Sequence, residues 1–145
     1  MRHFLSLIVL AILISCQKKA EEKSCPIEQK KESKFKMYEM SEMSLLMEQM
    51  FADNMRLKTR IMSGEAVGKF PEHFNKIHQA QMTDPGENDD FFQEQADAYL
   101  TAQHLIYDDS AQAKKHFNAG VDACIQCHEA KCTGPIDRIK KLYIP

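Results

Sequence analysis

The feature that most constrains the fold is a stripe of residues recurring at spacings of three and four between Phe35 and Ser63. This spacing places the residues on one face of an α-helix and predicts an amphipathic helix over the range. Gly64 follows the stripe and is expected to end the helix, because glycine readily adopts the left-handed conformation that closes helices. The stripe consists of Met40, Met43, Met47, Met50, Asn54, Leu57 and Ile61.

Three further segments show the same helical period. The second begins at Pro71 and ends at turn residues 83–86, and residues 88–90 supply N-cap candidates for the third. The fourth begins after residues 108–110 and ends near residues 134–135. Their stripes are Phe74, Ile77 and Gln81 in the second, Phe92, Ala96, Tyr99, Gln103 and Ile106 in the third, and Phe117, Val121, Cys124 and His128 in the fourth.

Four amphipathic helices with short connections predict an all-α fold, specifically an antiparallel four-helix bundle. Bundles of this kind can hold a cofactor between facing helices. No alternation of useful length indicates a strand, and residues 136–145 are expected to add one short turn.

The N-terminus has the pattern of a lipoprotein signal peptide. A short basic start precedes an apolar run over residues 4–14, which is too short to span a bilayer comfortably but suits a signal-peptide core. Residues 13–16 resemble a bacterial lipobox, so we expect cleavage before Cys16 and diacylglycerol on its sulfur. The alternative is an ordinary signal peptide, with Cys16 there by chance.

These patterns divide the chain into a signal peptide over 1–15, a charged flexible tether over 16–34 and a folded domain over 35–145. Acyl chains would anchor the protein to a membrane in the bacterial periplasm. Gln17 is not the aspartate that retains some lipoproteins in the inner membrane, so the outer membrane is favoured. The net charge of −2 lacks the basic excess of a nucleic-acid-binding protein.

The motif that carries chemistry is C-x-x-C-H at Cys124, Cys127 and His128, the attachment pattern for c-type haem. Two thiols one helical turn apart can reach the two vinyl groups of a porphyrin, and the adjacent histidine can bind the iron as proximal ligand. Export favours this interpretation, because haem is attached outside the cytoplasm. We therefore expect one covalent haem c.

Three alternatives compete with haem. Cys124, Cys127, His128 and Cys132 are of residue types that bind zinc, but ligands so close together on one helix converge poorly. A redox C-x-x-C needs a thioredoxin-like βαβ context, which the sequence lacks. The third alternative is a chance match without a cofactor.

A C-terminal C-x-x-C-H on the fourth of four helices resembles the class II c-type cytochromes, the cytochrome c-prime family, over residues 37–131. The resemblance implies a haem between the first and fourth helices. The family usually has an aromatic residue three positions after the haem histidine and a basic residue four positions after it, where this chain has Lys131 and Cys132. The chain would therefore be a divergent member, in which Lys131 could still reach a haem propionate.

The residue that faces the other side of the iron decides the function. An apolar residue leaves the iron five-coordinate and open to small gases, whereas a methionine fills the sixth site and raises the reduction potential. Counted from Gly64, Met47 is closest to the position of the ligand in Met-ligated relatives, and Met43 lies one turn earlier. Methionines at helical spacing are also common as adaptable core residues. The other histidines that could be ligands are His73, His78, His104 and His116.

The five cysteines are an odd number for an exported protein. Lipid on Cys16 and two thioethers to haem leave Cys25 and Cys132, which could form a disulfide in an oxidising compartment. Two free thiols, or a different pairing, are the alternatives.

Together these observations predict an electron-transfer cytochrome rather than an enzyme, because no catalytic acid–base constellation is evident. The expected partners are redox proteins, the membrane through the lipid anchor and, by analogy with the family, a second copy of the chain. The main alternative is a five-coordinate haem protein that binds nitric oxide or carbon monoxide. A small peroxidase or nitric-oxide-handling enzyme, and a structural lipoprotein with a zinc site, are further alternatives.

Overall fold

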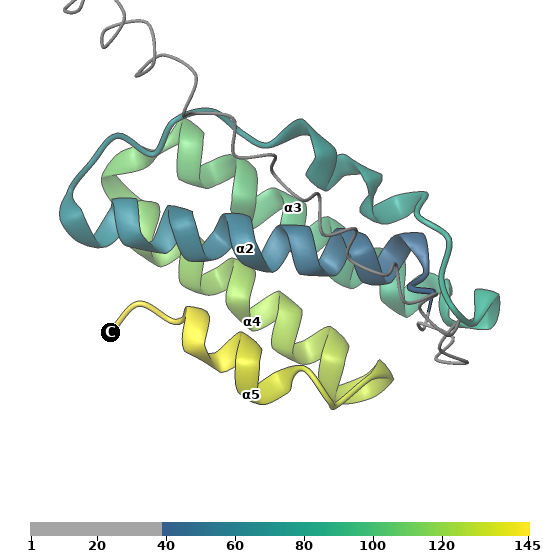
Figure 1. Cartoon of the computed structure of the whole chain (residues 1–145). Coiled ribbons are helices and arrows are strands. Elements are labelled where there is room, and N and C mark those ends of the chain that lie inside the picture. Colours follow the sequence, from purple (N-terminus) through teal and green to yellow (C-terminus); the bar gives the residue numbers. More distant parts are fainter. Residues whose placement is uncertain (1–38) are drawn as a thin grey trace, which may run out of the picture. The chain divides into compact units, whose positions relative to one another are not determined.

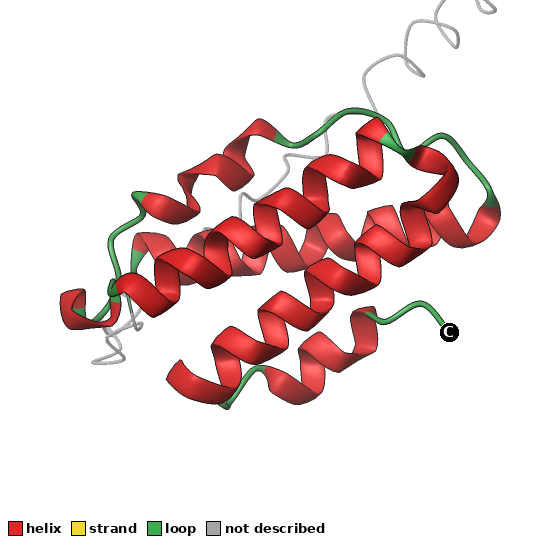
Figure 2. Ribbon diagram, turned by 180° about the vertical axis from the view of Figure 1, so that it is seen from behind, coloured by secondary structure: helices red, strands yellow, loops and turns green. Residues whose placement is uncertain are grey.

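A computed structural model of the chain describes residues 39–145. Within this range the structure consists of helices and loops, without strands (Figure 2), so the predicted all-α class is confirmed there. No helix in the same range has the length and apolar character needed to cross a membrane. The signal peptide, Cys16, the tether over 16–34 and Cys25 lie outside the described residues, and the expectations about them stay predictions.

The first long helix, α2, spans Glu42–Ser63 and begins later than predicted. The Ser41 side chain accepts a hydrogen bond from the backbone N–H of Ser44 at 3.2 Å and is the N-cap. The prediction placed the start too early because the apolar spacing continues through Met40, whereas the cap at Ser41 determines where the helix begins. The end is as predicted: Gly64 adopts φ 71° and its N–H bonds the carbonyls of Arg60 and Ile61.

The second predicted α-helix is wrong in type and length. The segment forms a short 3-10 helix, η1, over Glu72–His78, and a single turn, η2, over Pro85–Glu87. Phe74 and Ile77 are buried as the stripe predicted, whereas Gln81 is exposed beyond the end of η1. Residues three apart lie in line on a 3-10 helix, so this pair can be buried without an α-helix.

The other two long helices are α3 over Asp90–Asp108 and α4 over Ala113–Lys131, joined by the turn η3 over Ser110–Gln112. Asp89 caps α3 by accepting from the N–H of Phe92 at 2.9 Å. All the residues of the predicted α3 stripe are buried. Figure 2 shows α3 and α4 side by side, and their packing is the most extensive between helices in this range.

The chain ends in α5 over Ile136–Ile139 and the turn η4 over Lys140–Leu142. This C-terminal segment lies along α4, while α2 runs on the side of the helices nearest the viewer in Figure 1. α2 and α4 approach each other closely at few positions.

Buried side chains form two apolar clusters, and the partly buried Cys124 contacts both. The first cluster joins α2, η1 and α3 and includes Met43, Met50, Phe74, Phe92 and Tyr99. The second joins α2, α3 and α4 to the C-terminal segment and includes Ile106, Phe117, Val121, Ile139 and Leu142. The C-x-x-C-H motif therefore lies where the two clusters meet.

We predict that Gly64→Ala lowers the free energy of unfolding by about 1 kcal/mol, because φ 71° strains any residue with a Cβ. Urea denaturation measures the change. Gly134→Ala is the matched control, since Gly134 has no positive φ and a Cβ there would meet nothing within 4 Å. Equal effects of the two substitutions would contradict the explanation.

Candidate functional site

The last two turns of α4 carry Cys124, Cys127 and His128, and the structure brings all three to the wall of one small cavity. The three side chains are partly buried. Their separations of three and four residues place them on neighbouring positions of the helix surface. The motif is thus presented on a single side of α4, toward α2 and α3.

Three cavities surround His128. The inner cavity, of about 30 Å³, lies among α2, α3 and α4 and is lined by both motif cysteines. The side cavity, of about 80 Å³, lies between α2 and the C-terminal segment and reaches Tyr99 of α3. The groove, of about 430 Å³, lies between the start of α2 and the end of α4. The groove falls within the ~300–1,000 Å³ range of small-molecule and cofactor sites.

Met47 and His128 are the two residues that line all three cavities. Met43, the second methionine predicted as a ligand, is buried. It lines the groove but neither of the other two cavities. Met50, a further methionine of the same stripe, lines the inner and side cavities. Met47 therefore shares more cavities with His128 than either neighbouring methionine does.

The His128 ring is oriented by its own helix end. Its Nδ1 lies 2.9 Å from the carbonyl oxygen of Cys132. A carbonyl only accepts, so Nδ1 carries the hydrogen and the neutral ring keeps its lone pair on Nε2. Histidines that bind metals usually donate their other ring N–H to a carbonyl or carboxylate, which fixes the ring and raises its basicity. His128 is thus arranged as a ligand through Nε2.

The other four histidines of the domain have partners of their own and line none of these three cavities. His73 pairs with Asp53 at 2.8 Å, and His78 contacts Gln93 at 2.6 Å. The structure gives no support to a second histidine ligand. The remaining two are His104, which stacks on Phe70, and His116, which contacts Asp109.

Burial raises the pKa of the Cys124 thiol to about 12 and also raises the pKa of Cys127. Among residues 39–145 no three side chains of His, Cys, Asp or Glu converge on a point that could hold a metal ion. Cys132 is exposed. Its predicted pairing with Cys25 involves a residue outside the described range.

The wall of the side cavity contains a polar network that the sequence analysis missed. Asn54 Nδ2 donates to the carbonyl of Met50 and to the hydroxyl of Tyr99, both at 2.8 Å. Gln103 Nε2 donates to Asn54 Oδ1 at 2.9 Å. The three polar side chains are 4%, 3% and 1% exposed. Asn54 and Gln103 stand at stripe positions otherwise held by apolar residues, and that was the signal available in the sequence.

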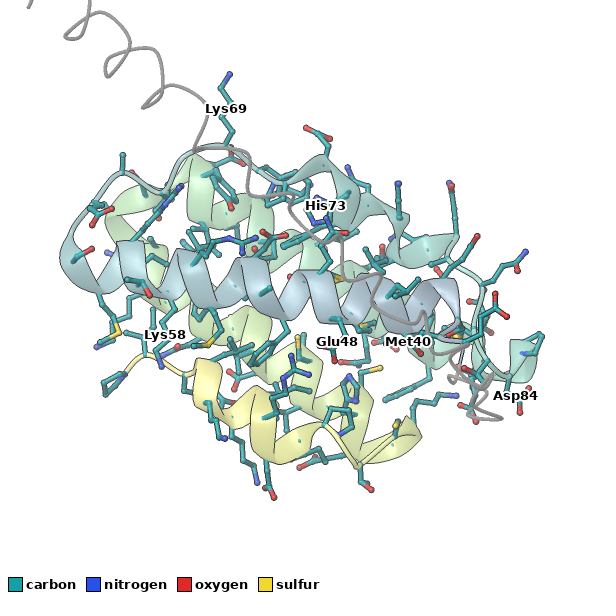
Figure 3. All side chains as sticks on the ribbon, viewed as in Figure 1. Met40, Glu48, Lys58, Lys69, His73 and Asp84 are labelled. Atoms are coloured by element: carbon teal, nitrogen blue, oxygen red, sulfur yellow. The ribbon has the colours of Figure 1, made fainter. Side chains whose placement is uncertain are left out.

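Arg138 closes the side cavity from the C-terminal segment. Its guanidinium donates to both oxygens of Glu48 on α2, at 2.5 and 2.7 Å, and lies 3.9 Å from the centre of the Phe51 ring. Figure 3 shows Glu48 on the side of α2 that faces α5, and His73 on the opposite side. The hydrogen bonds from Arg138 hold the pKa of Glu48 below its ordinary value.

Lys131, which the resemblance offered as a haem-propionate partner, forms ion pairs at the rim of the groove. Its ammonium lies 3.0 Å from Glu87 and 2.5 Å from Asp89. Hydrogen bonds from Lys131 and from the N–H of Phe92 lower the pKa of Asp89. These contacts join the end of α4 to the start of α3.

Comparisons of this chain with protein-family models, with curated proteins and with solved structures give no match. The functional argument therefore rests on the residues of the site.

We predict that Arg138→Gln destabilises the protein by about 0.5–1 kcal/mol at neutral pH, through loss of an exposed ion pair and an aromatic contact. Glu48 has a lowered pKa, so its contribution is present above the ordinary value of 4.5 and is lost as the pH falls through the lowered folded value. The difference between wild type and variant in urea denaturation should therefore shrink in acid.

The control for this prediction is Arg56→Gln. Arg56 pairs with Asp53 inside α2 and joins no second element. It should change stability less than Arg138→Gln does. A larger effect of the control would show that the contact between α5 and α2 is unimportant.

Proposed function

We propose that this protein is an electron-transfer c-type cytochrome with one haem c bonded to Cys124 and Cys127 and with His128 as the proximal ligand. The observation that carries the proposal is the orientation of His128. Its Nδ1 is fixed on the Cys132 carbonyl, so Nε2 keeps a free lone pair at a residue that shares the inner cavity with both motif thiols.

The residues present fit a haem in their chemistry. The motif cysteines lie one helical turn apart beside an imidazole. The other residues of the inner cavity are mainly apolar, whereas the groove combines four methionines and a phenylalanine with polar and charged side chains. The few close approaches between α2 and α4 support a cofactor between these helices. When bound, haem supplies a one-electron couple between ferrous and ferric iron. The chain would hold it covalently, orient the imidazole and exclude water from its face.

Met47 is the proposed distal ligand. It lines every cavity that His128 lines, on the helix across from α4. A thioether in the sixth position raises the reduction potential and favours electron transfer. Met43, the other predicted candidate, shares only the groove with His128.

The wider proposal includes the bundle arrangement, divergent membership of the cytochrome c-prime family, and export. The packing of α2, α3 and α4 with η1 supports the bundle. The apolar run before Cys16 supports cleavage, lipidation and a periplasmic location on a membrane, the outer membrane being favoured. Redox proteins are then the expected partners, and a homodimer is an expectation from the family alone.

A second candidate is a five-coordinate haem protein that binds nitric oxide or carbon monoxide. One observation favours it: the side cavity at His128 has a volume of about 80 Å³. That volume exceeds the ~10–15 Å³ that one water molecule requires, so a small ligand has room there.

We predict that the exported wild-type protein retains haem on a denaturing gel, and that its intact mass includes one haem. The double variant Cys124→Ala, Cys127→Ala should lose both signals, because no thioether can form. Cys132→Ala is the matched control and should keep the haem. A colourless wild type without the added mass would overturn the proposal.

We predict that Met47→Ala converts a six-coordinate low-spin spectrum, with sharp α and β bands in the reduced state, into a high-spin one. Absorption spectra of both oxidation states measure the change. Met62→Ala is the control, since Met62 lies on the same helix and is 56% exposed. Met43→Ala and Met50→Ala test the neighbouring sulfurs. A wild type that is already high-spin and binds carbon monoxide readily would favour the second candidate instead.

A further inference from the structure

The polar network on the wall of the side cavity leaves one proton without an acceptor. The carbonyl of Met50 can only accept, so the side-chain nitrogen of Asn54 must face it. The second hydrogen of that nitrogen goes to the Tyr99 hydroxyl, which is therefore the acceptor in this contact. Among residues 39–145 the Tyr99 hydroxyl has no hydrogen bond other than the one that it accepts from Asn54.

The position of this proton follows from the lining of the cavities. The polar ends of Asn54 and Tyr99 meet, and both residues line the side cavity together with Met47 and His128. Tyr99 also lines the inner cavity with the same two residues. The free donor is thus on a wall shared with His128.

Tyr99 is a neutral donor at physiological pH. It is 3% exposed, and burial raises its pKa well above the ordinary value of 10. Gln103 Nε2 donates to Asn54 Oδ1 at 2.9 Å, and Asn54 Nδ2 donates to the Tyr99 hydroxyl at 2.8 Å. These two hydrogen bonds fix the direction of the phenol. A buried donor without an acceptor is unfavourable, which suggests that an acceptor is supplied by something held in the cavity.

We propose that Tyr99 determines ligand specificity by donating a hydrogen bond to a small haem ligand held in the side cavity. The expected ligand is a molecule of two or three heavy atoms that carries an oxygen or nitrogen acceptor. A weak acceptor such as carbon monoxide gains little affinity from this hydrogen bond. Hydrogen-bond donors beside haem iron help to decide which small molecules bind there. The inference rests on the proposed haem and applies when the sixth iron position is open, as in the five-coordinate candidate or after the Met47 thioether leaves the iron.

The test compares two probes, cyanide on the ferric protein and carbon monoxide on the ferrous protein. All variants carry Met47→Ala, so that neither probe has to displace a thioether. Tyr99→Phe keeps the ring and removes the donor. It should raise the Kd for cyanide about 3- to 10-fold, the loss expected for one hydrogen bond. The Kd for carbon monoxide should change less than about twofold, because it is a weak acceptor.

Infrared spectroscopy gives a second readout, which packing alone would not move. Loss of a donor beside bound carbon monoxide should raise its stretching frequency in the Tyr99→Phe variant. The matched control is Tyr107→Phe, on the same helix, where the half-buried ring packs edge-on against Phe70 and lines none of the three cavities. It should leave both ligand affinities and the frequency unchanged.

Asn54→Leu provides a second variant should Tyr99→Phe fold poorly. It keeps the phenol but removes the group that fixes it, and it should weaken cyanide binding less than Tyr99→Phe does. Equal weakening of both probes, or unchanged cyanide affinity in a haem-loaded variant, would overturn this inference alone. A wild type without haem would overturn the proposed cytochrome first, and this inference with it.

Discussion

The close packing of α4 on α3 is the interaction on which the rest of the site depends. At Gly120 a Cβ would lie 3.4 Å from the side-chain nitrogen of Gln103 and 3.7 Å from Tyr99, which are ordinary van der Waals distances, so α4 lies directly against the polar network here. Ala102 and Ala123 are also buried at small volume. With α4 held on α3 in this way, the C-x-x-C-H motif lines the inner cavity among α2, α3 and α4.

The C-terminal segment completes the domain that α3 and α4 begin. Ile139, Leu142 and Ile144 are all buried against the second apolar cluster. The segment is also tied to the long helices by polar contacts with its backbone. Lys58 of α2 donates to the carbonyls of Lys141 and Tyr143 at 2.8 and 2.7 Å. Residues 135–142, which follow the C-x-x-C-H motif, supply one wall of the side cavity, and the contacts of Arg138 and Lys58 hold that wall against α2.

Helical periodicity predicted the three long helices and most of their buried faces, because burial along a helix is a local consequence of spacing. It failed for residues 71–82, since a pair such as Phe74 and Ile77, three apart, fits a 3-10 turn as well as an α-helix. The C-x-x-C-H motif was visible because its spacing is local to one turn of helix. Periodicity alone does not rank Met43, Met47 and Met50, because all three share one stripe and the ranking depends on how α2 is rotated against α4. The preference for Met47 came from the resemblance, counted from Gly64.

The polar network shows most clearly what sequence pattern could not resolve. Asn54 and Gln103 occupy stripe positions, where apolar side chains of similar size would avoid the cost of burying amides. One explanation is that the network fixes the register of α2 against α3. A network serving only register would gain most if every donor and acceptor were paired, because each buried polar group left unpaired costs about 1–3 kcal/mol. Among residues 39–145 this network is not closed: Gln103 Oε1 is buried without a donor, and the Tyr99 hydroxyl has only the hydrogen bond that it accepts from Asn54. Helix register leaves these two open ends unexplained, and the one at Tyr99 belongs to a residue on the wall of the side cavity, as the proposed ligand contact requires.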